Sequence, residues 1–127
     1  MSVTADQRRA ATAFDCVEDV AKNHPGERAE YRTAAMSLGG HVRRNGLVAA
    51  LAYYQRNPKA RWAQLIFKHI AEAGIHGLTV DDGDVEIISA IPRRARSLAR
   101  SDYLLATREL LRFALWLRRA AQATIPE

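Results

Sequence analysis

The stretch SDYLLATRELLRFALWLRRAAQATIP, residues 101–126, has the periodicity of one long α-helix. At about 100° per residue its apolar side chains form an arc wide enough to enter a core, made up of Tyr103, Ala106, Leu110, Phe113, Ala114, Leu117 and Ala121. Arg108, Arg112 and Arg119 lie opposite this arc, within about 40° of one another. Further apolar residues flank the arginines and exceed what a small monomer needs: Leu104, Leu105, Leu111, Leu115 and Trp116. We predict that this helix packs inward on a core and sideways on a protein partner, through these flanking residues.

The composition favours an all-α fold, a compact bundle of five to six helices that forms one domain over residues 1–127. Gly and Pro are sparse, at 7 and 4 residues, while Ala, Leu and Arg, all good helix formers, are abundant. No segment has the alternating pattern of a β-strand. The single cysteine fits a reducing compartment, and the chain shows neither a membrane-length apolar run nor a signal-peptide core. We expect a cytoplasmic protein with no membrane partner.

Capping and helix-breaking residues divide the first part of the chain. A capping box at residues 4–7 starts a helix, and His24-Pro25-Gly26 ends it. We expect a second helix from about residue 27 to 36, with a break or kink at Gly39-Gly40, since glycine is unfavourable inside helices. A third helix reaches residue 56, and Gly46 either opens a new helix or lies inside one where another backbone comes close.

The second part of the chain is punctuated by prolines and glycines. After Asn57-Pro58 we expect a fourth helix from about residue 60 to 73, a loop over residues 74–84 and a short helix that Asp84 or its neighbour caps. Pro92 must end or kink this short helix, because proline has no backbone donor. Ser101 is a good N-cap for the final helix.

The sequence offers no constellation typical of an enzyme. The histidines share no metal-ligand spacing, and the lone Cys16 has no neighbouring cluster of ligands. His69 lies on an apolar stripe, where a buried and hydrogen-bonded histidine is the simpler interpretation. Residues 81–84 hint at a calcium loop, but no bidentate glutamate follows at the required distance. We therefore expect no catalytic residue, no metal, no cofactor and no small-molecule substrate.

Positive charge is concentrated in two blocks, +6 over residues 31–72 and +5 over residues 93–127, with −4 between them. Of the 19 basic residues 16 are arginine, whose guanidinium suits bidentate phosphate contacts, although each alone can equally be a solvated surface charge. Tyr53, Tyr54 and Trp62 lie nearby and either stack on bases or belong to the core. Clusters near turns and helix ends are the candidates for contacting an RNA backbone, namely Arg43, Arg44, Arg56, Lys59, Arg61, Arg93, Arg94, Arg96 and Arg100.

Four segments, taken in order, resemble a known family. They are YRTAAMSL (31–38), NGL (45–47), LAY (51–53) and the run from Tyr103 to WLRR (116–119). Together they resemble the small helical subunit of type III-B CRISPR effector complexes, the Cmr complexes, and the likeness covers about residues 8–123. The family commonly has Leu-Pro where this chain has Leu38-Gly39, so the kink persists while a rigid helix start is lost.

The resemblance implies a non-catalytic subunit of an RNA-guided RNA-silencing machine of antiviral defence. In that family several copies stack into a short filament beside the backbone subunits, and the filament lines the channel where guide and target RNA pair. The implied partners are therefore other subunits of the effector complex, copies of this chain, guide RNA and target RNA. Target cleavage belongs to the backbone subunit in that family, so no catalytic residue carries over.

Two alternatives stay open on the sequence alone. One is a helix-turn-helix DNA-binding regulator, with residues 43–46 as the turn and residues 47–54 as the recognition helix. That segment is poor in base-reading side chains, since it and the following residue offer mainly Tyr54 and Gln55. The other is a helical adaptor without nucleic-acid binding, in which the arginines only solubilise the surface.

Overall fold

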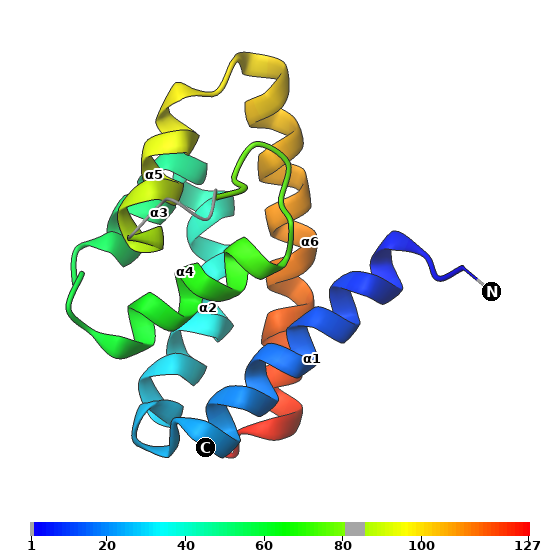
Figure 1. Ribbon diagram of the computed structural model, residues 1–127, viewed down its shortest axis with the longest axis vertical. Helices are drawn as coiled ribbons and strands as arrows, with labels where there is room; N and C mark the ends of the chain where they lie inside the picture. The colour runs from blue at the N-terminus through cyan, green and yellow to red at the C-terminus, as the bar shows by residue number, and fades with distance from the viewer. Residues whose placement is uncertain (1, 81–85) are drawn as a thin grey trace.

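The computed structural model describes residues 2–80 and 86–127, which form six α-helices and one short 3-10 helix (Figure 1). No strand occurs in these residues, and none of their helices is long and apolar enough to cross a bilayer. The predicted all-α bundle of five to six helices is confirmed. The elements are α1 (Ala5–Asn23), η1 (Pro25–Glu27), α2 (Arg28–Asn45), α3 (Leu47–Gln55), α4 (Arg61–Glu72), α5 (Ile87–Ser97) and α6 (Arg100–Thr124).

Helix α6 is the longest element and packs against both α1 and α2 (Figure 1). Helix α5 packs on α3 and α4, and both of these pack on α2. The predicted inner face of α6 is confirmed, because Tyr103 alone of that set is partly exposed while the others are buried: Ala106, Leu110, Phe113, Ala114, Leu117 and Ala121. Helix α2 therefore links the long helices to the group formed by α3, α4 and α5.

The predicted start of α1 is confirmed in detail. The Thr4 hydroxyl accepts a hydrogen bond from the Gln7 backbone at 3.0 Å, and the Gln7 side chain accepts one from the Thr4 backbone at 2.7 Å. These reciprocal bonds satisfy two backbone donors that helix geometry leaves free. Helix α1 ends before His24, and η1 leads from Pro25 into α2.

Two tyrosines carry polar groups into the core, and each hydroxyl is hydrogen-bonded. The Tyr31 hydroxyl lies 2.6 Å from Nδ1 of His69, whose burial lowers its pKa to about 4 and keeps the imidazole neutral. The Tyr54 hydroxyl donates to the Ala34 carbonyl at 2.9 Å and lies 3.0 Å from the Ser37 hydroxyl. A buried polar group is tolerated when it is bonded in this way. The prediction of a buried, hydrogen-bonded His69 is confirmed.

The predicted break at Gly39-Gly40 is wrong. Helix α2 runs through both glycines to Asn45, because tertiary packing outweighs the low helix propensity of glycine where α6 approaches. The chain breaks at Gly46 instead, with φ +88° and ψ 165°. This conformation is available essentially to glycine alone. Of the two interpretations of Gly46, the one that opens a new helix is confirmed.

Two further boundaries differ from the prediction. Helix α5 does not end at Pro92, one of the two outcomes predicted there, but continues to Ser97, since Pro92 is itself buried and packing of this helix outweighs the lost backbone hydrogen bond. Ser101 is not the N-cap of α6: extended backbone at Leu98 and Ala99 starts the helix at Arg100. The Tyr103 N–H bonds the Ala99 carbonyl at 2.8 Å, which places Ser101 in the first turn. The capping role of Asp84 and the calcium-loop residues 81–84 lie outside the described residues.

Replacing Gly46 by alanine should lower the free energy of unfolding by about 1–3 kcal/mol, because a Cβ makes this backbone conformation unfavourable. Gly39→Ala is the matched control, since its Cβ would meet the Ala114 Cβ at 3.6 Å, an ordinary contact. Alanine also raises helix propensity, so this variant should be more stable by up to about 1 kcal/mol. Urea unfolding followed by circular dichroism measures both. Equal effects of the two substitutions would contradict the helix break at Gly46.

Candidate nucleic-acid interface

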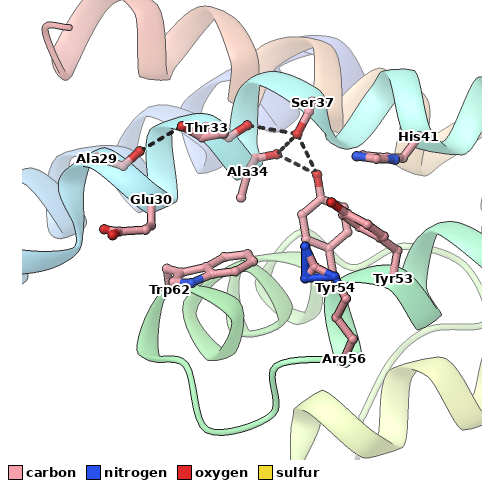
Figure 2. Close-up of a pocket in the computed structure, with 10 residues that line it drawn as sticks. All are labelled: Ala29, Glu30, Thr33, Ala34, Ser37, His41, Tyr53, Tyr54, Arg56 and Trp62. Carbon is pink, nitrogen blue, oxygen red and sulfur yellow. Dashed lines mark hydrogen bonds between the residues drawn. The ribbon is translucent and has the colours of Figure 1, made fainter.

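An open groove of about 340 Å³ lies between α2, the end of α3 and the start of α4 (Figure 2). Helix α2 supplies one wall, including Thr33, Ser37 and His41, while the Tyr54 hydroxyl and the Trp62 ring point toward it from the opposite side. The walls mix aromatic rings with hydroxyl groups. The remaining lining residues are Ala29, Glu30, Ala34, Tyr53 and Arg56.

Tyr53 is the exposed aromatic residue of this groove. Its ring stacks on His41 with centroids 4.5 Å apart and 27° between the planes. The guanidinium carbon of Arg56 lies 4.0 Å from the centroid of the same ring, in cation–π contact. Tyr53 is still 43% exposed. The faces of this ring are therefore engaged by His41 and Arg56, and the contact holds the exposed Arg56 side chain beside the groove.

The other two aromatic residues have different roles. Tyr54 is buried, and this burial raises the pKa of its phenol to about 12 although the Ser37 hydrogen bond acts in the opposite sense. Trp62 is half-buried, with its ring centroid 6.2 Å from that of Tyr54. All three aromatic residues considered from the sequence line the groove, and Tyr54 is the one that is buried in the core.

The first basic block is spread over more than one surface. Arg56 lines the groove. Burial, and then the charges of Arg44 and Arg56, lower the pKa of His41 below its usual value, so both arginines act on this groove residue. Arg43 lines a different hollow between α2 and α6. Lys59 is exposed in the turn before α4, and Arg61 begins α4 and bonds Gln64. Of this block, Arg56 therefore lines the groove, and Arg44 is near enough for its charge to act on His41.

The candidate RNA contacts of the second basic block lie on the last turns of α5 and at the start of α6. Arg93, Arg96 and Arg100 are exposed, and Arg94 is half-buried. Helix α5 packs on α3 and α4, so this block extends from the same group of helices that carries the groove. Exposed arginines at helix ends can follow a phosphate backbone without reading bases.

The apolar residues predicted to contact a partner separate into two groups. Leu104, Leu105 and Leu115 are 56%, 38% and 40% exposed, although most large apolar side chains of the described chain are covered. Leu111 and Trp116 pack partly against the core. The Trp116 indole donates to the Asp6 carboxylate at 2.9 Å, which ties α6 to α1. The structure therefore leaves the three leucines as the exposed part of the predicted contact surface.

One arrangement of polar residues is not apparent from the sequence. Cys16 of α1 lies beside His69 and Glu72 of α4, with potential ligand atoms of all three within 4.8 Å of one another. The expectation that Cys16 has no neighbouring cluster is therefore wrong. The only local signal is the i, i+3 spacing of His69 and Glu72 on one helix face.

Comparison with known proteins finds one family. The family described as CRISPR-associated protein (Cas_Cmr5) matches residues 5–124. The CRISPR system Cmr subunit Cmr5 of Thermus thermophilus is 33% identical over 124 residues, covering 98% of each chain. The crystal structure of a CRISPR-associated Cmr5 family protein from the same organism superposes with a TM-score of 0.79 at 30% identity, over 97% of this chain and 99% of that one. The fold, the sequence and the family match lead to one conclusion: this chain belongs to the Cmr5 family of CRISPR-associated proteins.

Proposed function

We propose that this chain is the small, non-catalytic subunit of a cytoplasmic type III-B Cmr effector complex. In this proposal copies of the chain stack beside the backbone subunits and line the channel where guide RNA pairs with target RNA. Its relative from Thermus thermophilus is named as a subunit of the Cmr system. The role of the chain is to hold RNA and neighbouring subunits in place.

The exposed leucines of α6 are the observation that carries the proposal. Leu104 and Leu115 lie within about 20° of each other on the helical wheel and are both exposed, and Leu115 borders the hollow between α6 and α2. Arg108, Arg112 and Arg119 continue the same exposed face. A surface of leucines and arginines suits a partner that offers both apolar and acidic groups.

The groove and the basic clusters support contact with RNA. Arg44 and Arg56 can meet phosphates, while Trp62 offers a ring on which an unpaired base can stack. In RNA-guided complexes base pairing with the guide reads the sequence, so the protein needs only backbone and shape contacts. A groove that combines cations with aromatic rings can make such contacts without reading the base sequence.

The helix-turn-helix alternative is disfavoured by the burial of α3. Leu47, Ala50, Leu51 and Tyr54 face the core. The exposed positions of this helix include Ala52 and Tyr53. These side chains make few hydrogen bonds to base edges in a major groove. In a direct test, the chain should bind single-stranded RNA more tightly than duplex DNA at matched salt, and the reverse order would favour the regulator.

Substituting Arg44 and Arg56 together by alanine should weaken target RNA binding by the reconstituted complex by about tenfold at moderate salt, because two phosphate contacts are lost. The slope of log affinity against log salt should fall by about 0.7 per lost contact. Filter binding between about 50 and 200 mM salt measures both quantities. A second variant with Arg93, Arg94 and Arg96 replaced by alanine tests the other block in the same way.

The matched control for charge is the pair Arg8→Ala and Lys22→Ala, two exposed cations of α1. This control should leave both the affinity and the salt slope unchanged. If the control weakened binding as much as the Arg44/Arg56 variant, the RNA contact would be a general effect of net charge. That result would contradict the placement of RNA at the groove.

Replacing Leu104 and Leu115 by aspartate should exclude the chain from the assembled complex, because charges would be buried in an apolar contact. Both residues are exposed, so the helical circular dichroism spectrum of the isolated chain should not change. Val3→Asp is the control, since Val3 is 50% exposed before α1. Co-purification with tagged backbone subunits measures incorporation. Normal incorporation of the double variant would rule out α6 as the contact surface.

A further inference from the structure

Cys16, His69 and Glu72 form a compact cluster between α1 and α4. The Cys16 thiol donates to the Glu72 carboxylate over 3.4 Å, and potential ligand atoms of all three side chains lie within 4.8 Å of one another. His69 and Glu72 are three positions apart on α4, so their side chains leave the helix on one face. Cys16 and His69 are buried, at 3% and 1% exposure.

We propose that this cluster binds a zinc ion. A thiolate, an imidazole and a carboxylate are the three kinds of protein ligand that zinc takes. Around tetrahedral zinc such ligand atoms lie about 3.3–3.8 Å apart, so movements of about one ångström convert the present arrangement into a site. A dication would also relieve the repulsion between a thiolate and a carboxylate held this close.

The surroundings of His69 favour coordination through one defined nitrogen. Nδ1 lies 2.6 Å from the buried Tyr31 hydroxyl, so coordination through Nε2 would keep this hydrogen bond. The rings of Tyr31 and His69 meet edge to face, with centroids 5.4 Å apart, so the imidazole is held in position. Partners of this kind orient metal-binding histidines and fix their tautomer.

The cluster is open to solvent on the side of Glu72. This exposed residue lines a surface hollow of about 440 Å³, which also contains Arg8, Arg9 and Glu109. The two arginines and two glutamates balance in charge, and Glu72 belongs both to this hollow and to the cluster. A fourth coordination position would be filled by water. Since α1 packs chiefly on α6, a zinc ion here would add a direct link between α1 and α4.

Zinc titration of the full-length, reduced chain, against a chromophoric zinc chelator, tests the site. We expect a single tight site, a higher Tm with zinc than with EDTA, and with Co²⁺ a thiolate-to-cobalt charge-transfer band. Cys16→Ala and Glu72→Gln should each weaken zinc binding at least about tenfold, and Cys16→Ala should abolish the cobalt band. Because Glu72 is exposed, the Glu72→Gln variant should still fold and can test the site even if the Cys16→Ala variant does not fold.

Asp15→Asn is the matched control, because Asp15 is exposed on α1 next to Cys16 and lies outside the cluster. This variant should bind zinc like the unaltered chain. Failure of the unaltered chain to compete with the chelator would overturn the proposal. Zinc binding in the Glu72→Gln and Cys16→Ala variants with the affinity of the unaltered chain would overturn it as well, since the ion would then lie elsewhere.

Discussion

The packing of α6 between α1 and α2 is the constraint on which the rest of the structure depends. Its inner face alternates large side chains such as Leu110 and Phe113 with small ones such as Ala106 and Ala114. Small residues let two helices approach closely, and Gly39 of α2 lies opposite Ala114. This contact holds α2 helical through two glycines and uses one face of α6. The other face, with its leucines and arginines, remains available to neighbouring subunits.

A continuous α2 also builds the groove. Ser37, His41 and Arg44 follow one another on this single helix. The chain then reverses direction at Gly46, so that α3 packs back against α2. The return is fixed at Tyr54, whose hydroxyl bonds the Ala34 carbonyl of α2. It places Tyr53 against His41 and Arg56 over the Tyr53 ring. The candidate RNA site is therefore a consequence of where α2 ends.

Most of the fold follows from local sequence signals, and the errors share a physical cause. The capping box at Thr4 and the apolar arc of α6 depend on neighbouring residues, so their prediction is confirmed. Gly39 and Pro92 are unfavourable in an isolated helix, but here helix–helix packing outweighs that local cost. When tertiary contacts are unknown, the sequence alone predicts a helix boundary at such residues.

The candidate site was predictable only in part. Clustering of arginines identifies both basic blocks, but which of them meet at one groove depends on how α2, α3 and α4 pack. Tyr53 and Tyr54 are adjacent on the same helix, yet Tyr54 is buried and Tyr53 is exposed. Cys16 and Glu72 are 56 residues apart, so no spacing rule joins them. Long-range contacts of this kind are set by tertiary structure alone.

The central claim is that this chain acts within an RNA-guided complex, through the outer face of α6 and the groove of α2 and α3. Affinity purification of the tagged chain from its own host, with sequencing of the bound nucleic acid and mass spectrometry of the bound proteins, tests it most directly. We predict recovery of the other Cmr subunits together with short guide RNAs. Recovery of the chain alone, or with duplex DNA and no Cmr subunit, would contradict the claim.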